Sequence, residues 1–238
     1  MKYLITGGAG FIGSHLVEKL LNANNKIIVL DNYSTGRKEN LKNFKNVNLL
    51  KCDISKKGNW FKKFKDVDCV FHIAALADIV PSINNPVKYY NSNVNGTLNV
   101  LEACKKYSVK KMIYTASSSC YGIPSKYPTA ETENIDNQYP YALTKYLGEQ
   151  LCLHWGKLFN IDVISLRLFN VYGTRSRTSG TYGAMFGVFL AQKLARQPFT
   201  VVGDGNQTRD FTYVTDVVSA LITAPKIFNL LNMIKIFY

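Results

Sequence analysis

The sequence predicts an α/β protein built on a doubly wound parallel sheet, and three patterns support this prediction. Short, nearly uninterrupted apolar runs recur through the first part of the chain, as expected for strands covered on both faces. Segments with apolar residues at helical spacing separate these runs. A glycine-rich turn joins the first apolar run to the first helical segment. Alternation of this kind is typical of a parallel sheet with helices on both sides.

The expected elements follow one another in a regular order. Apolar runs predict strands at residues 2–6, 26–30, 47–51, 69–74 and 111–116. One helix follows the glycine-rich turn, and a second covers about 86–107 with Val94, Leu98 and Leu101 at helical spacing. A third helix runs from Tyr141 to about Phe159 and precedes a strand at 162–169.

The second half of the chain is less regular. Residues 173–183 are rich in Gly, Ser, Thr and Arg and predict a loop, which a short helix at 185–195 follows. Two apolar runs then flank a Gly-Asp-Gly turn within 199–214. No linker composition separates the two halves, so we expect the second half to form excursions from one sheet.

Composition narrows the function classes. The 238 residues are 47% hydrophobic, the N-terminus lacks the apolar core of a signal peptide, and no run approaches membrane-spanning length. Five scattered cysteines, never spaced C-x-x-C, indicate reduced thiols. With three equally scattered histidines, we predict no metal site and a cytoplasmic location without a membrane partner.

The net charge of +13 raises the possibility of nucleic-acid binding. The lysines are spread along the chain in the company of many asparagines. We therefore predict no nucleic-acid partner, and the alternative of a basic nucleic-acid binder predicts salt-sensitive retention on DNA.

The glycine-rich turn predicts a dinucleotide site of the Rossmann type. Residues 7–13, "GGAGFIG", follow the first strand directly and open a helix. Glycines allow a tight turn and close approach to a pyrophosphate at the helix N-terminus. Asp31 ends the second strand, where a carboxylate would bind ribose hydroxyls and favour NAD over NADP. Arg37 and Lys38 nearby keep NADP open as an alternative.

A tyrosine and a lysine stand four residues apart, at Tyr141 and Lys145, and so share one helix face. A phenol with a pKa near ~10 is a poor base at neutral pH, and lowering it to about 7 requires about 4 kcal/mol. We expect the Lys145 cation and a positive nicotinamide ring to favour the phenolate.

Several stretches together resemble the extended short-chain dehydrogenase/reductases that act on nucleotide sugars, and most of all the UDP-glucose and UDP-N-acetylglucosamine 4-epimerases. The resemblance covers about residues 1–222 and implies NAD as cofactor. The stretches are "TGGAGFIGSHL", "DNYSTG", "HIAALA", "NVNGTLNVLEAC", "ASSSCYG", "YPYALTK", "LRLFNVYG" and "GDGNQTRDFTYVTD".

The resemblance implies a set of catalytic residues. The family's catalytic Ser or Thr stands four residues before a Tyr-Gly pair, which here is Ser117. Tyr141 would accept the proton of the sugar 4-hydroxyl, Ser117 would hydrogen-bond that oxygen, and Lys145 would hold the nicotinamide ribose. Hydride would pass from C4 to NAD and return to the other face of the keto sugar.

Further site residues are carried over from the resemblance. For Ile73, Ala74, Ala75 and Phe169 a simple core role stays open, as does a turn cap for Asp53. Asn170 and Arg209, with Ser117 and Tyr141, match substrate-binding positions, and Arg209 suits a diphosphate oxygen. The cofactor-binding set is Gly7, Gly10, Phe11, Ile12, Gly13, Asp31, Asn32, Ser34, Thr35, Gly36, Asp53, Ile54, Ile73, Ala74, Ala75, Asn93, Tyr141, Lys145 and Phe169.

Two serines distinguish among the relatives. Related 4,6-dehydratases carry Asp-Glu directly after the catalytic Ser or Thr, and UDP-glucuronate decarboxylases usually carry Glu two residues before the tyrosine. This chain has Ser118 and Ser119 there, so dehydration lacks its general acid and 4-epimerisation is favoured. Ala77 stands where some glucose-specific epimerases carry a lysine, and this difference slightly favours N-acetyl sugars as substrates. A UDP-glucuronate 4-epimerase or decarboxylase, and an NAD-binding protein without turnover, remain alternatives.

The resemblance also implies a division of the chain. We expect an NAD-binding domain at 1–168 that carries the catalytic residues, and a small, truncated substrate lobe at 169–238 interleaved with the sheet. "KIFNL", residues 226–230, resembles a family strand that follows the helix beginning near Asp216. The helices near 86–107 and 141–159 imply a homodimer contact.

Overall fold

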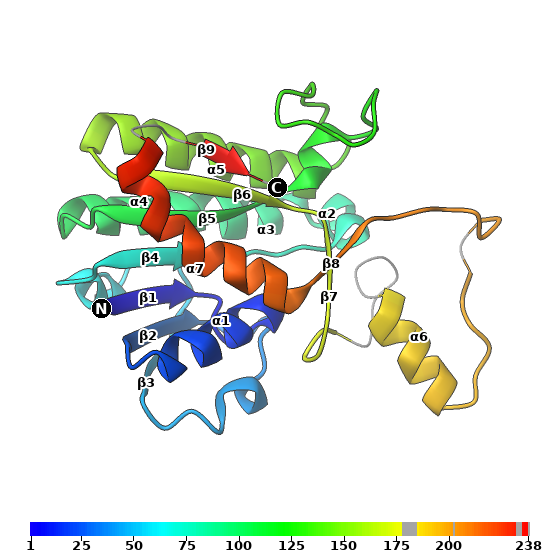
Figure 1. The fold of residues 1–238 in the computed structure, drawn as a ribbon, viewed down its shortest axis with the longest axis horizontal. Helices are drawn as coiled ribbons and strands as arrows, with labels where there is room; N and C mark the ends of the chain where they lie inside the picture. The colour runs from blue at the N-terminus through cyan, green and yellow to red at the C-terminus, as the bar shows by residue number, and fades with distance from the viewer. Residues whose placement is uncertain (178–184, 202, 232–234, 238) are drawn as a thin grey trace.

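A computed structural model describes residues 1–177, 185–201, 203–231 and 235–237. Its centre is a seven-stranded, wholly parallel sheet in the order β3-β2-β1-β4-β5-β6-β9 (Figure 1). The predicted doubly wound α/β fold is therefore confirmed. The strands are β1 (Lys2–Thr6), β2 (Lys26–Asp31), β3 (Val47–Lys51), β4 (Cys69–His72), β5 (Lys111–Ser117), β6 (Asp162–Leu168) and β9 (Lys235–Phe237).

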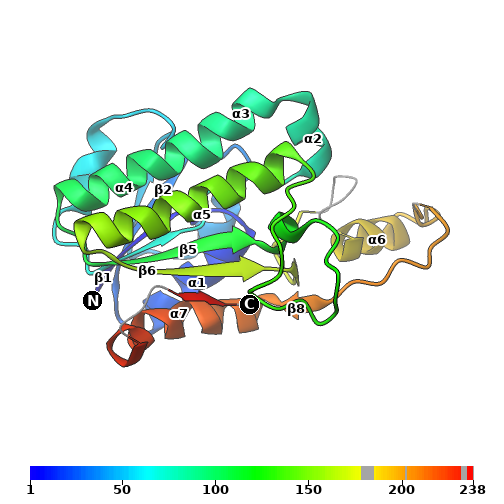
Figure 2. The same ribbon diagram turned by 90° about the horizontal axis from the view of Figure 1, so that it is seen from above.

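Helices cover both faces of this sheet (Figure 2). One face carries α1 (Phe11–Asn22) and α7 (Val214–Leu231), which pack against each other. The other carries α5 (Pro140–Phe159) beside a long helical run, in which α3 (Pro86–Tyr90) continues through a π-helical turn (Asn91–Asn95) into α4 (Gly96–Lys106). The helix expected over 86–107 is thus present, with an irregular turn in its middle.

Shorter elements complete the fold. α2 (Ile79–Asn84) precedes α3, and 3-10 turns cover Lys38–Leu41, Asn59–Phe64 and Ser118–Tyr121. β7 (Asn170–Tyr172) pairs in parallel with β8 (Phe211–Tyr213) in a separate two-stranded sheet. α6 (Met185–Leu194) stands beyond this small sheet, away from the main one (Figure 1).

The two faces of the sheet have separate hydrophobic cores, and neighbouring residues of one strand supply opposite cores. Ile5 packs with Leu16 and Val29 under α1 and α7. Leu4, its neighbour, packs with Leu101 and Met112 under α4 and α5. Successive side chains of a strand point to opposite faces, so a strand buried on both must be apolar throughout. This is the pattern from which the strands were predicted.

Two expectations for the second half need correction. The strand expected at 226–230 is wrong, because these residues continue α7, and the last described strand is β9 instead. Val217, Val218 and Leu221 are buried at helical spacing and continue the helix. The expected strand at 162–169 ends one residue earlier, at Leu168. Residues 178–183 of the expected loop lie outside the described residues.

Candidate active site

The glycine turn between β1 and α1 packs too closely for side chains. Gly7 has φ +73°, and a Cβ there would lie 2.8 Å from the Cα of Ala74. A Cβ on Gly13 would lie 2.2 Å from the carbonyl oxygen of Gly7. Gly10 precedes α1 and offers no side-chain cap to the first N–H groups of the helix, while its carbonyl oxygen accepts the N–H of Ser14 at 3.0 Å. The turn therefore presents an anion-binding helix N-terminus at the sheet's carboxyl edge.

A cavity of about 260 Å³ opens in front of this turn. It lies where the strand order reverses between β1 and β4, the usual ligand crevice of such sheets. Most of the predicted cofactor residues line it together: Gly7, Gly10, Phe11, Ile12, Gly13, Asp31, Asn32, Ser34, Thr35, Asp53, Ile54, Ile73, Ala74 and Ala75. Gly36, Asn93, Tyr141, Lys145 and Phe169 of the predicted set do not line it.

Asp31 is held at this cavity by the backbone. Its two carboxylate oxygens accept hydrogen bonds from the N–H of Ala9 at 2.9 Å and of Tyr33 at 2.8 Å. Burial raises the pKa of Asp31, and these two hydrogen bonds lower it. A Cβ on Gly36 would come within 2.9 Å of Asp31 Oδ1, so Gly36 allows the loop after β2 to close on the carboxylate. The remaining acceptor capacity of Asp31 suits ribose hydroxyls.

The loop after β7 also lines the cavity, which was not predicted from the sequence. Arg175, Ser176 and Arg177 follow β7 and line the same cavity. Arg175 pairs with Glu18 on α1 at 2.5 Å, and Arg177 pairs with Asp78 beyond β4 at 2.8 Å. The arginine-rich composition of 173–177 was the available signal, but nothing in the sequence gave its partners. Arg37 and Ala77, which the sequence singled out for cofactor and sugar preference, also line the cavity, and the remaining lining residues, which were not predicted, are Leu30, Asn40, Cys52, Asp78 and Ser92.

Ser117 and Tyr141 meet although 24 residues separate them in sequence. Ser117 ends β5, and Tyr141 is the second residue of α5. Burial raises the pKa of Tyr141, while a hydrogen bond with Ser117 lowers it. Ser117 Oγ also lies 2.8 Å from Ser119 Oγ and accepts the N–H of Ser119 at 3.2 Å. The serine loop, residues 117–119, thus turns its first hydroxyl towards Tyr141.

Lys145 lies one turn further along α5 and is buried. Its Nζ donates to the carbonyl oxygen of Thr115 at 2.5 Å and lies 4.4 Å from the ring centre of Tyr114. Burial lowers the pKa of Lys145 to about 8. The expectation that this lysine depresses the pKa of Tyr141 is not met by the chain's own groups, because the pKa of Tyr141 is raised. Any net depression of that pKa requires further positive charge in the cleft.

A chain of buried hydrogen bonds joins β1, β4 and α5 behind the cavity. Asn93 accepts the N–H of Leu76 at 2.8 Å and donates to Thr144 Oγ1 at 3.1 Å. The predicted cofactor residue Asn93 therefore holds the loop after β4 against α5. His72 lies between Thr6 and Thr97, at 2.6 and 2.8 Å, and burial lowers its pKa to about 3. It is a neutral core histidine.

The expected substrate residues Asn170 and Arg209 lie near each other, because β7 pairs with β8. Asn170 Nδ2 donates to the carbonyl oxygen of Asp210 at 3.1 Å. Arg209 is exposed and donates to the carbonyl oxygen of Thr208. Neither lines the cavity. Phe169 lies at the junction of β6 and β7.

The described residues form neither a membrane-spanning helix nor a metal-binding cluster. No described helix has the length and apolarity to span a bilayer. No three of the described His, Cys, Asp and Glu side chains gather closely enough to hold a metal ion.

The fold and this site define a dinucleotide-binding protein of the extended short-chain dehydrogenase/reductase class. The profile of the NAD dependent epimerase/dehydratase family matches residues 3–228. The chain belongs to this family.

Its relatives include epimerases and decarboxylases. It is 41% identical to a putative UDP-glucose 4-epimerase of Methanocaldococcus jannaschii, with 93% of this chain and 72% of that protein covered. A UDP-N-acetylglucosamine 4-epimerase from Methanobrevibacter ruminantium superposes with a TM-score of 0.90 at 36% identity, over 94% of this chain and 73% of that one. UDP-glucuronic acid decarboxylase 1 of Arabidopsis thaliana is 37% identical over 93% of this chain, which spans 51% of that protein.

Proposed function

We propose that the protein is an NAD-dependent nucleotide-sugar 4-epimerase acting on a UDP-hexose or UDP-N-acetylhexosamine. The observation that carries this proposal is the hydrogen-bonded pair of Ser117 and Tyr141, with serines rather than carboxylates at 118 and 119. Relatives described as UDP-glucose and UDP-N-acetylglucosamine 4-epimerases support the substrate class. Ala77 lines the cavity and favours the N-acetyl-accepting branch.

NAD fits the residues present. Gly7 and Gly13 leave the turn free of side chains, and Asp31 offers a carboxylate at the cavity, which opposes a 2′-phosphate. Arg37 lines the same cavity, so NADP remains the second candidate. When bound, NAD supplies a hydride acceptor that later returns the hydride, so that epimerisation requires no external oxidant.

The side chains of the site then have separate tasks. Tyr141 accepts the proton of the sugar 4-hydroxyl and returns a proton after the keto sugar has turned over. Ser117 donates a hydrogen bond to the same sugar oxygen and thereby orients it. Lys145, a cation at pH 7 because its pKa is about 8, would hold the nicotinamide ribose and supply positive charge to the site. Asn170 and Arg209 are the proposed contacts for the sugar nucleotide, and Phe169 is the proposed neighbour of the nicotinamide.

The serine loop argues against dehydration. Expulsion of a 6-hydroxyl requires a general acid close to the leaving oxygen. Ser119 stands where relatives carry a carboxylate, and its hydroxyl is engaged with Ser117 at 2.8 Å. The second candidate is a UDP-glucuronate 4-epimerase or decarboxylase, which the 37% identity to the plant decarboxylase favours.

Proton NMR of incubated nucleotide sugars tests this proposal. The purified protein with NAD is incubated with UDP-glucose, UDP-galactose, their N-acetyl forms and UDP-glucuronate. We expect the 4-epimer of at least one of the four neutral sugars, far slower but measurable formation by Ser117→Ala on longer incubation, and none from Tyr141→Phe within the same time. Carbon dioxide from UDP-glucuronate would instead establish the decarboxylase, and cofactor binding without turnover would establish a non-catalytic NAD-binding protein.

We further propose an NAD-binding domain at 1–168, a substrate lobe from 169, a cytoplasmic location and a homodimer. Apolar side chains exposed on adjoining helices support the dimer: Val80, Ile83, Val87 and Tyr90 on α2 and α3, and Leu143 on α5.

A further inference from the structure

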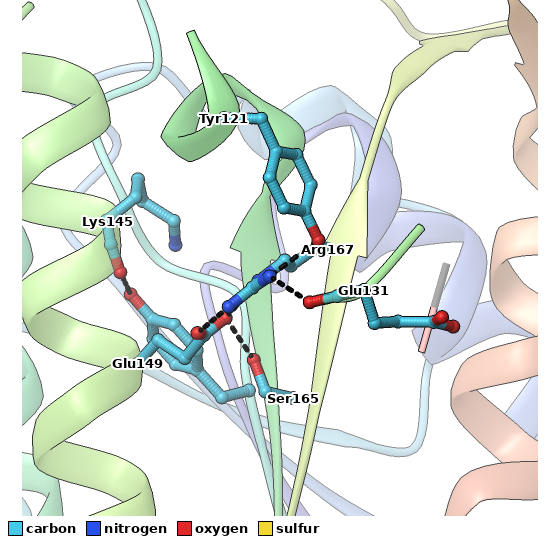
Figure 3. A network of polar contacts seen from close by, with 7 residues as sticks. Tyr121, Glu131, Lys145, Glu149, Ser165 and Arg167 are labelled. Carbon is cyan, nitrogen blue, oxygen red and sulfur yellow. Dashed lines mark hydrogen bonds and ion pairs between the residues drawn. The ribbon is translucent and has the colours of Figure 1, made fainter. Parts of the chain in front are cut away.

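A buried ion pair lies next to the serine–tyrosine pair and takes no part in the proposed chemistry (Figure 3). Arg167 on β6 donates to both carboxylate oxygens of Glu149 on α5, at 2.7 and 3.0 Å. Both side chains are at most 4% exposed. Ser165 Oγ donates to the same carboxylate at 3.0 Å. The carboxylate is therefore satisfied, and the guanidinium is held in one orientation.

The third nitrogen of this guanidinium, Nη1, faces away from Glu149 and contacts Tyr121, just after the serine loop. Arg167 Nη1 donates to the hydroxyl of Tyr121 at 2.5 Å and to the carbonyl oxygen of Glu131 at 3.4 Å. Tyr121 is 2% exposed and ends the 3-10 turn that begins directly after Ser117. Its ring also stacks on the guanidinium, 4.9 Å from centre to centre. Arg167 thus binds Tyr121 at the C-terminal end of the 3-10 turn, and Ser117 lies directly before the N-terminal end of that turn.

The other end of the ion pair belongs to the catalytic helix. Tyr141, Lys145 and Glu149 follow one another at intervals of four, and so lie along one face of α5. Figure 3 shows Lys145 and Glu149 pointing from this helix towards the sheet, with Arg167 between Glu149 and Tyr121. Contacts therefore link Tyr141 to Ser117 by a second route. This route runs along α5 to Glu149, then through Arg167 to Tyr121, and along the 3-10 turn to Ser117.

We propose that Arg167 is a positioning residue for the epimerase reaction: anchored on Glu149, it holds the Tyr121 hydroxyl and thereby fixes Ser117 against Tyr141. The inference rests on the proposed function, since it concerns the same reaction. A lysine cannot replace Arg167 in this role, because it offers no planar fork for Glu149 and Tyr121 at once.

Tyr121→Phe is the sharpest test, because it removes one hydroxyl and keeps the buried ring and the Glu149–Arg167 pair. We expect kcat to fall roughly five- to tenfold, the effect of one lost hydrogen bond. KM and NAD affinity should stay within twofold of wild type. Tyr3→Phe is the control, since it removes a buried hydroxyl that contacts Met1 at the opposite end of the sheet, and it should leave kcat unchanged.

A double-mutant cycle separates positioning from general loosening. If Tyr121 acts through Ser117, Tyr121→Phe should have no further effect on kcat in a Ser117→Ala background. An equal loss in both backgrounds, or an unchanged kcat in Tyr121→Phe, would overturn the inference.

A readout without turnover distinguishes this inference from the proposed function. The hydrogen bond from Ser117 lowers the pKa of Tyr141, against the effects of burial, Asp78, Tyr89 and Cys120. Ultraviolet titration, taken in each case as the difference from the same protein carrying Tyr141→Phe, should therefore give a higher Tyr141 pKa in Tyr121→Phe than in wild type. If the Tyr141 pKa were higher in Tyr121→Phe but the wild type epimerised no sugar, the proposed function would be refuted and the positioning of Ser117 by Arg167 would stand. An unchanged pKa would refute the positioning whatever the activity.

Discussion

Lys145 is a charged group in a place that disfavours charge. It is 4% exposed, and burial lowers its pKa to about 8 from an ordinary value of 10.5. Between these two pH values the unfolded chain binds a proton at this residue and the folded chain does not. The free energy of unfolding therefore rises with pH across that window, by at most roughly 3 kcal/mol. Below pH 8 this stability is lost.

Lys145→Met should remove this pH dependence. Thermal melts at pH 7 and pH 9.5 are expected to show a smaller Tm difference in the variant than in wild type, because the methionine has no proton to bind. Activity should fall at both pH values. A Tm difference equal to that of wild type would contradict the assignment, and Lys157→Met, on the same helix but exposed, is the matched control.

The close contact between α5 and β5 depends on Gly148, which has no side chain. The hydroxyl of Tyr114 donates to the carbonyl oxygen of Lys145 at 3.1 Å, and a Cβ on Gly148 would lie 2.3 Å from that hydroxyl. The helix can lie this close to the strand only because position 148 is glycine. The distance between the Ser117 end of β5 and the Tyr141 end of α5 follows from this contact.

Gly148→Ala should therefore push the helix from the strand. Alanine at an unstrained helical position usually stabilises by about 0.5–1 kcal/mol, and here the overlap should reverse the sign. Chemical denaturation should show a lower free energy of unfolding, and NMR assays a lower kcat. Gly148→Ala combined with Tyr114→Phe, which removes the overlapping hydroxyl, should recover part of the stability. No recovery would show that the overlap lies elsewhere.

The loop after β7 gives a second prediction at this scale. Arg177 and Asp78 pair across the cavity at 2.8 Å, and both are partly exposed. Asp78→Arg places two cations together and should weaken NAD binding about two- to fivefold, as expected for an exposed pair. The exchange Asp78→Arg with Arg177→Asp should restore the affinity to within twofold. Calorimetric titration at low and high salt measures this, and the difference should shrink with salt. If the double exchange bound NAD as weakly as Asp78→Arg alone, the pair would have no role in NAD binding.

The elements that could be predicted from the sequence are those set by local pattern. β1, the glycine turn and α1 are contiguous, so strand, motif and helix support one another within the first 22 residues. "KIFNL" was misassigned because a five-residue stretch with three apolar residues fits a buried helix as well as a strand. Arg177 and Arg167 were missed because their partners, Asp78 and Glu149, are 99 and 18 residues away. Such pairs follow from the closed fold and not from spacing.

At the scale of the whole molecule, we propose that the helical face formed by α2, α3 and α5 is the surface that contacts a second copy. Val87 is 71% exposed and Ile83 is 51% exposed, on helices that contact one another. Val87→Glu should convert a dimer to a monomer, as measured by light scattering on a sizing column. Leu194→Glu, on α6 and equally exposed, should leave the dimer intact. A Val87→Glu variant with the mass of wild type would contradict this assignment.

The closeness of Gly13 to the Gly7 carbonyl has a consequence for how related chains are interpreted. Any side chain at position 13 would meet backbone before it met a ligand. A descendant that had lost Ser117 or Tyr141 would still need that glycine in order to fold. The glycine signature is therefore evidence of the fold, whereas the evidence for the proposed chemistry comes from Ser117 and Tyr141.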